Sequence, residues 1–176
     1  MIKTTLMAIG VLALVGCAAP PPPDYATQHK AALDAYLAGW SEGKVDGLDA
    51  VLTSNFTRRS SAGMNADGIP AIKKVMTDIR TAYPDLKVVF DESYHTKDMS
   101  FHLWTATGTN TGPGATPATG KSIKVPGMTL VRYQDGKMAS EVVRMDVLDW
   151  YTQLGYTLAP PAGTATAPAA APAPKK

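Results

Sequence analysis

Residues 123–145 read IKVPGMTLVRYQDGKMASEVVRM, and this stretch decides the class of fold. Two β-rich runs, 123–133 and 138–145, lie on either side of the turn sequence Gln134-Asp135-Gly136-Lys137. An Asp-Gly pair between two such runs indicates a tight type I′ hairpin, because both central positions of that turn need a positive φ. We therefore expect the second half of the domain to be an antiparallel sheet.

The first half of the domain has helical periodicity instead. Apolar residues recur at i, i+3, i+4 and i+7 within residues 26–43, which predicts an amphipathic helix that ends at Gly43. A second apolar stripe runs over residues 69–83, with Asp67 as a candidate N-cap and Pro84 as the stop.

Shorter elements complete the pattern. They are a helix at 48–52, strands at 55–60, 86–91 and 99–109, and a last helix at 147–154 closed by Gly155. Helices that precede a hairpin-rich sheet predict an α+β fold, in which the helices pack on one face of a curved antiparallel sheet.

Residues 1–16 have the pattern of a signal peptide. Lys3 is followed by an apolar run over residues 6–15, which is too short to span ~30 Å of hydrocarbon. Leu14-Val15-Gly16-Cys17 resembles the lipobox of bacterial lipoproteins, so we expect a lipid on Cys17 that anchors the protein to the membrane. Ala18 after the cysteine suggests sorting to the outer membrane, facing the periplasm. The alternative is an ordinary secretory signal with an incidental cysteine.

Composition divides the rest of the chain into three parts. Residues 17–25 are a Pro-rich spacer, residues 26–158 have the size of one domain, and residues 159–176, rich in Ala and Pro, are expected to be disordered. The formal net charge is +2 at pH 7, but three lysines lie in the two ends, so residues 24–158 by themselves are near −1. A nucleic-acid partner is not expected, because it needs a concentrated basic footprint.

Two common chemistries find no support in the sequence. Residues 114–122 look like a phosphate-binding loop, yet they have one residue too many between the glycines, contain a proline and lead into a strand. His29, His95 and His102 have no metal-ligand spacing, and Cys17 is the only cysteine, so we expect neither a metal site nor a cofactor.

Two side chains are candidates for acid/base chemistry. Asp146 lies between the last strand and the last helix, where it either caps the helix or acts as a general acid or base in an apolar cavity. Counted back by twos, it shares a strand face with Arg144 and Val142. His102 shares a face with Trp104 and is either a hydrogen-bonded structural histidine or a catalytic base that assists Asp146.

From about residue 32 to residue 155 the chain resembles the SnoaL-like polyketide cyclases of the nuclear-transport-factor-2-like superfamily. The motifs follow the family's order: WSEGKVDGLD at 40–49, GI at 68–69, YPDL at 83–86, WTATGTNTG at 104–112, TGK at 119–121, GMTLVRY at 127–133, DGK at 135–137 and QLG at 153–155. The resemblance implies a cone-shaped α+β barrel, in which a curved sheet wraps around the N-terminal helices and a ligand cavity, often as a homodimer. It also places Asp146 at the position of the family's cavity aspartate, the general acid/base of a cofactor-free ring closure.

Three functions fit this pattern. The first is binding of a small, mostly apolar molecule, with Trp40 and Trp104 as walls and Arg132 or Arg144 as a polar handle. The second is a cofactor-free cyclase, isomerase or hydrolase that uses Asp146 as general acid/base. The third is an envelope scaffold whose cavity is vestigial.

Three departures from the family pattern rank these functions. Members of the family often carry Arg, His and Trp where this chain has Leu103, Asn110 and Val142. Loss of polar cavity groups from a retained scaffold favours binding over catalysis, so we place binding first.

Overall fold

The computed structural model describes residues 23–159. The predicted signal peptide, the expected lipidation site Cys17, most of the Pro-rich spacer and nearly all of the Ala/Pro-rich tail lie outside the described residues. The elements are, in chain order, α1 (Tyr25–Glu42), α2 (Leu48–Val51), β1 (Leu52–Ser60), β2 (Ala66–Asp67), α3 (Ile69–Ala82), β3 (Lys87–His95), β4 (Met99–Thr109), β5 (Ser122–Gln134), β6 (Lys137–Met145) and α4 (Val147–Gln153). Within this part of the chain, no helix is long and apolar enough to cross a bilayer.

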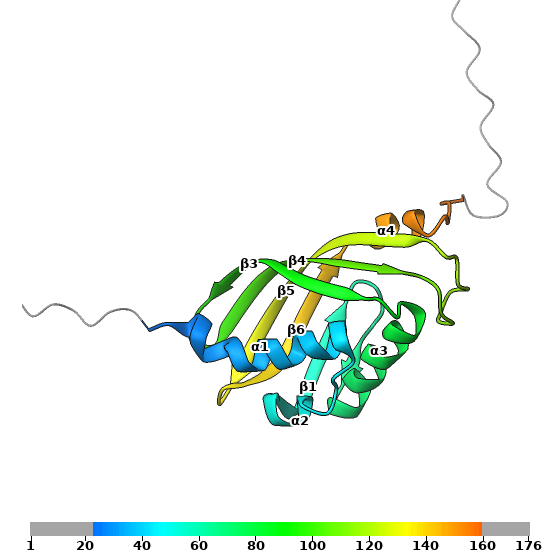
Figure 1. The fold of residues 1–176 in the computed structure, drawn as a ribbon. Coiled ribbons are helices and arrows are strands. Elements are labelled where there is room, and N and C mark those ends of the chain that lie inside the picture. The colour runs from blue at the N-terminus through cyan, green and yellow to red at the C-terminus, as the bar shows by residue number, and fades with distance from the viewer. Residues whose placement is uncertain (1–22, 160–176) are drawn as a thin grey trace, which may run out of the picture.

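One curved sheet of six strands holds the domain together, in the order β2-β1-β6-β5-β4-β3. The predicted α+β class is confirmed, and α1 and α3 lie on the same side of the sheet (Figure 1). The expectation of a purely antiparallel sheet is wrong, because β1 pairs with β6 in parallel. Parallel neighbours need a long connection, and here α3 and the strands β3 to β5 lie between the two partners in sequence.

The local signals for turns and caps agree with the structure in most places. Asp135 and Gly136 both have positive φ, 50° and 76°, which confirms the type I′ hairpin between β5 and β6. Gly43 ends α1 in the left-handed region, with φ 73°, as predicted. Asp67 is not the N-cap of α3: Gly68 holds that position, while Asp67 pairs within the sheet in β2.

The buried faces of α1 and α3 fill the concave side of the sheet. Tyr36 and Trp40 of α1 belong to the same core cluster as Ile72 and Met76 of α3. Arg80 fixes the two helices, because its guanidinium donates to the backbone carbonyls of Trp40 at 3.1 Å, Ser41 at 2.7 Å and Leu86 at 3.2 Å. These bonds join the end of α1, α3 and the segment before β3.

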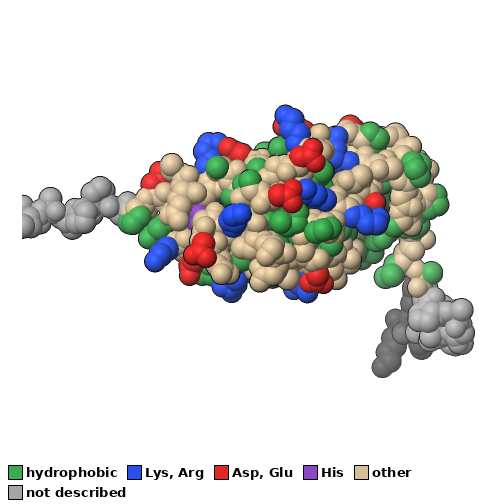
Figure 2. All heavy atoms as spheres, turned by 90° about the horizontal axis from the view of Figure 1, so that it is seen from below, with side chains coloured by type: hydrophobic (Ala, Val, Ile, Leu, Met, Phe, Trp, Pro, Cys, Tyr) green, Lys and Arg blue, Asp and Glu red, His purple; other side chains and the backbone are tan. Residues whose placement is uncertain are grey.

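The surface of the domain has mixed charge. On the face drawn in Figure 2, acidic and basic side chains are interspersed and no field of one sign forms. This matches the near-neutral charge of the domain and gives no footprint for a polyanion.

Candidate functional site

A mostly apolar cavity lies between α1 and the concave face of the sheet. Its volume is about 80 Å³. The apolar part of its wall includes Leu33, Trp40, Phe90, Trp104, Val125 and Val143. Met64, Met138 and Met145 also line it, and methionine side chains adapt their shape readily. The cavity is therefore small at rest but has a deformable wall.

Two charged side chains line this cavity, and they form an ion pair. Arg58 of β1 and Glu141 of β6 are directly opposite each other in the parallel register, with 5% and 2% of their surfaces exposed. The guanidinium contacts Glu141 Oε1 through Nη1 and donates from Nε to the carbonyl of Met64 at 3.0 Å. The Tyr36 hydroxyl also donates to Oε1, at 2.7 Å. Helix α1, two strands and the loop after β1 thus converge on one buried carboxylate.

The apolar surroundings shift the titration of this group of side chains. Burial raises the pKa of Tyr36 to about 12, against the opposing effect of Arg58. Burial also lowers the pKa of Arg58, although a guanidinium stays charged at any pH at which the protein folds. Arg58 lies over the ring of Trp40, 4.7 Å from its centroid, and gains a cation–π contact there. Tyr36 is therefore a permanent hydrogen-bond donor, and Arg58 a permanent cation.

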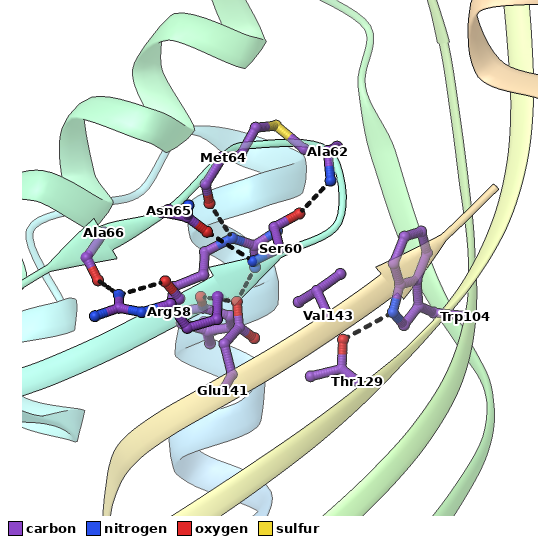
Figure 3. Close-up of polar contacts among 12 residues, drawn as sticks. Arg58, Ser60, Ala62, Met64, Asn65, Ala66, Trp104, Thr129, Glu141 and Val143 are labelled. Atoms are coloured by element: carbon purple, nitrogen blue, oxygen red, sulfur yellow. Dashed lines mark hydrogen bonds and ion pairs between the residues drawn. The ribbon is translucent and has the colours of Figure 1, made fainter. Parts of the chain in front are cut away.

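A second polar contact lies across the cavity. Trp104 Nε1 donates to Thr129 Oγ1 at 2.9 Å, and both residues are buried. Figure 3 shows Arg58 and Glu141 on one side of Val143 and the Trp104–Thr129 contact on the other. Trp104 reaches this position because the residue opposite it on β5 is Gly127, where a Cβ atom would lie 2.2 Å from the indole ring.

The structure brings two of the predicted binding residues together and separates the other two from them. Trp40 and Trp104 both line the cavity, as a binding role requires. Arg132 and Arg144 are exposed and lie on the opposite face of the sheet; the Arg132 guanidinium contacts Met99 Sδ, and Arg144 donates to the carbonyl of Val143. Among the described residues, the charged side chains that line the cavity are Arg58 and Glu141.

Asp146 lies at the N-terminus of α4 and outside this cavity. Its Oδ1 accepts the backbone N–H of Asp149 at 2.8 Å, so the side chain is the N-cap of the helix. It is exposed and lines a surface hollow together with Met128 and Arg144. The catalytic role of Asp146 stays a prediction, because the described contacts account only for the cap.

His102 is buried behind the cavity wall and does not line it. Its ring nitrogens contact the hydroxyls of Ser93 at 2.8 Å and Ser100 at 2.7 Å, and its ring stacks on Phe90. Burial, with His95 and then His29 as lesser causes, lowers the pKa of His102 to about 4. A neutral, doubly hydrogen-bonded ring is the arrangement of a structural histidine.

The three histidines, far apart in the sequence, come together at the end of the sheet near the start of α1. His29 Nδ1 lies 3.3 Å from His95 Nδ1, and His95 packs edge-on against His102 at 5.5 Å between ring centroids. Among residues 23–159, no group of three His, Cys, Asp or Glu side chains has the arrangement of a metal site. The cluster ties α1 to the β3–β4 hairpin.

Sequence reasoning missed Tyr36, Arg58 and Glu141 as a unit. One signal was available: Arg58 shares a strand face with Phe56, which is fully buried. Glu141 likewise shares a strand face with Val143 and Met145. A charged residue in phase with apolar ones in a strand is a candidate for a buried, functional group.

Comparison with known proteins agrees with this architecture. The solved structure of a proposed SnoaL-like polyketide cyclase from Jannaschia sp. CCS1 is similar, with 21% sequence identity and a TM-score of 0.69. The match covers 80% of this chain and 100% of that one. TsrD from Streptomyces laurentii is 24% identical, with a TM-score of 0.66, over 73% and 96%. AclR, a proposed hydroxylase from Streptomyces galilaeus, is 20% identical, with a TM-score of 0.63, over 75% and 98%.

Identity at this level shows a common fold and nothing about the reaction. No sequence among curated proteins matches the chain. The model of the SnoaL-like polyketide cyclases, however, matches residues 30–154, which is most of the chain and nearly all of the described domain. The chain therefore belongs to the SnoaL-like polyketide cyclase family.

Proposed function

We propose that this protein is an envelope-anchored lipoprotein whose SnoaL-like domain binds a small, mostly apolar molecule in the cavity between α1 and the sheet. The observation that carries the binding proposal is the buried Arg58–Glu141 pair in a cavity whose other walls are mainly apolar. Small-molecule sites have this composition: an apolar wall for affinity and a few placed polar groups for orientation.

Stability alone gives a weak reason for such a pair. Desolvation of two charges costs several kcal/mol per ion, and replacing a buried pair with apolar residues is often neutral or stabilising by about 1–4 kcal/mol. Arg58 and Glu141 are nevertheless both at least nine-tenths buried and line an unfilled space. Binding of a ligand that contacts the pair accounts for its presence, which a gain in stability does not.

The size of the cavity sets the size of the ligand. A volume of about 80 Å³ is below the roughly 300–1,000 Å³ of pockets that hold drug-sized molecules. The ~150 Å³ cavity that takes benzene is nearly twice as large, so the three methionines must move before a five-membered ring fits. A larger ligand requires movement of the Met64 loop.

The binding proposal is tested with small ring compounds on the full chain. Cyclopentane, cyclopentanol and cyclopentanone are titrated while backbone amide NMR shifts of the cavity strands are followed. Ala106→Leu fills the cavity from β4 and is expected to abolish these shifts, whereas Thr107→Leu, one position along and on the exposed face, leaves them unchanged. Failure of every probe to bind the wild-type protein would sink the proposal.

A cofactor-free acid/base reaction is the second candidate. It is favoured by Glu141, which is the only carboxylate among the described residues that line the cavity. Exchange of the α-hydrogens of cyclopentanone for deuterium in D₂O, followed by proton NMR, measures base catalysis without an assumed substrate. Acceleration by the wild type that disappears in Glu141→Gln supports the enzyme; equal rates in both leave binding as the function.

The envelope anchor rests on Cys17 and the apolar residues before it. Expression in a Gram-negative host is expected to place the protein in the outer-membrane fraction, with the mass increase of acyl chains on the processed N-terminus. Cys17→Ser should remove the added mass and leave residues 1–16 uncleaved, because lipobox processing requires the cysteine. Unmodified wild-type protein in the soluble periplasmic fraction would support the ordinary secretory signal instead.

A further inference from the structure

We infer that the cavity ligand is a neutral molecule that donates a hydrogen bond to Glu141, which makes it an alcohol, enol or phenol on a small apolar body. This inference rests on the proposed binding function and names the chemical class of its ligand. It follows from the way in which the polar groups around Glu141 are used.

The contacts of Glu141 are unequally shared between its two oxygens. Tyr36 donates to Oε1 at 2.7 Å, and Nη1 of Arg58 approaches the same atom. Within residues 23–159, no hydrogen bond to Oε2 is formed. An ionised carboxylate has about four acceptor sites, so half of its capacity is open on a side chain that is 2% exposed and lines the cavity.

Glu141 Oε2 accepts no hydrogen bond from the described residues and is not fully enclosed, so it is open to the cavity. An open acceptor among apolar walls favours an occupant that donates a hydrogen bond to it. A ligand hydroxyl does so, because it donates a hydrogen bond to Oε2 while its carbon body stays against the apolar wall. A ligand that has only acceptor groups, such as a ketone or an ether, leaves the Oε2 atom of Glu141 unsatisfied.

The charge balance of the site excludes ionic ligands. Arg58 and Glu141 compensate each other, and no other charged side chain among the described residues lines the cavity. A ligand carboxylate would meet Glu141, and a ligand ammonium would meet Arg58, in surroundings where an extra charge is strongly disfavoured. The site therefore selects a neutral molecule.

The other polar contact of the cavity competes less well for the ligand's hydroxyl. Trp104 uses its one N–H to donate to Thr129 Oγ1, which leaves the indole without a free donor. The Thr129 hydroxyl is neutral and is therefore a weaker partner than the Glu141 carboxylate. Val143 lies between this contact and Glu141, as Figure 3 shows. The hydroxyl therefore points to the Glu141 end, and the apolar body lies toward Trp104.

The test compares the affinities of matched ring compounds for the full-length protein by NMR titration. Cyclopentanol is expected to bind at least about tenfold more tightly than cyclopentanone or cyclopentane, as a hydrogen bond to a charged acceptor implies. Cyclopentylamine and cyclopentanecarboxylate are expected to bind more weakly than cyclopentanol. Equal affinities of alcohol and ketone, or tightest binding of either ion, would overturn the inference while leaving the proposed binding function intact.

A double variant tests the role of the ion pair itself. Arg58→Met with Glu141→Met replaces the pair by apolar side chains, so the fold is expected to hold while the preference for cyclopentanol disappears and cyclopentane still binds. Arg59→Gln with Asp67→Asn is the matched control, because it removes the neighbouring exposed ion pair between β1 and β2. A preference for the alcohol that survives the Met double variant contradicts the inference.

A single variant keeps the inference testable if the double variant does not fold. In Glu141→Gln an amide replaces the carboxylate and can present N–H groups to the ligand. The order of affinities is then expected to shift toward cyclopentanone by several-fold. Binding of no compound to the wild type removes the proposed function and this inference together, and is thereby distinct from a missing preference.

Discussion

The hydroxyl of Tyr36 donates a hydrogen bond to Glu141 Oε1 over 2.7 Å and so joins α1 to β6 across the cavity. Both residues are buried, and Glu141 also pairs with Arg58. The bond holds the helix against the sheet at the point where the only carboxylate among the described lining residues faces the enclosed space.

Tyr36→Phe is expected to lower the free energy of unfolding by about 1.5–3 kcal/mol, because it removes a buried hydrogen bond to a charged group. Tyr94→Phe is the matched control, since the Tyr94 hydroxyl donates to Glu92 at 2.8 Å on the exposed surface. That change should lower the free energy of unfolding much less, because water replaces the lost partner at an exposed site. Urea denaturation of both variants makes the comparison; equal losses would contradict the importance of the buried bond.

The buried His102 predicts a loss of stability in acid. Its pKa is lowered to about 4 in the folded protein, from an ordinary value of 6.5, so the unfolded chain binds the proton more tightly. The contribution of neutral His102 to the free energy of unfolding is complete above pH 6.5 and is lost as the pH falls toward 4. The loss amounts to roughly 3 kcal/mol, and His29 and His95, whose pKa values burial also lowers, act in the same direction.

Denaturant unfolding at pH 7.5, 5.5 and 4.5 measures this dependence. His102→Gln removes the titrating group and is expected to flatten the slope between pH 6.5 and 4, whatever its effect at neutral pH. The NMR titration of the His102 ring should show no protonation at pH 5.5. A ring that titrates near pH 6.5 would refute the predicted pH dependence.

Gly127→Ala is expected to displace the Trp104 ring, because the added Cβ atom would lie 2.2 Å from it. Overpacking of this kind costs about 1–3 kcal/mol, and the fluorescence of the displaced indole should shift. Gly47→Ala is the control, since nothing lies within 4 Å of its added Cβ and its φ is −68°. Full stability of Gly127→Ala would mean that Trp104 has room to move.

Two substitutions of Asp146 distinguish a structural role of this residue from a catalytic one. Asp146→Ala is expected to cost about 0.5–2 kcal/mol through loss of the cap on α4, whereas Asp146→Asn keeps the cap and nearly all of the stability. Neither change should alter the affinity of cyclopentanol for the cavity. A cofactor-free activity that is lost in Asp146→Asn at unchanged stability would establish the acid/base role and contradict this expectation.

The sequence by itself determined the elements whose signals are local. The apolar stripes of α1 and α3, the left-handed Gly43 and the Asp135-Gly136 turn each depend on residues within a few positions of one another. Such signals do not need the rest of the fold. They also carried the family resemblance, and with it the placement of Trp40 and Trp104 in the cavity wall.

Only the tertiary structure decided which polar residues enter the cavity. Arg58 and Glu141 meet because β1 and β6 pair in parallel, a non-local contact that the expected antiparallel sheet did not contain. Counting by twos along the last strand grouped Val142, Arg144 and Asp146 on one face, and all three are exposed, while Glu141 and Val143 face inward. The count did not show which of the two faces is the inner one. Strand faces have a period of two, so one shift in register exchanges inside and outside, and only packing against α1 fixes which is which.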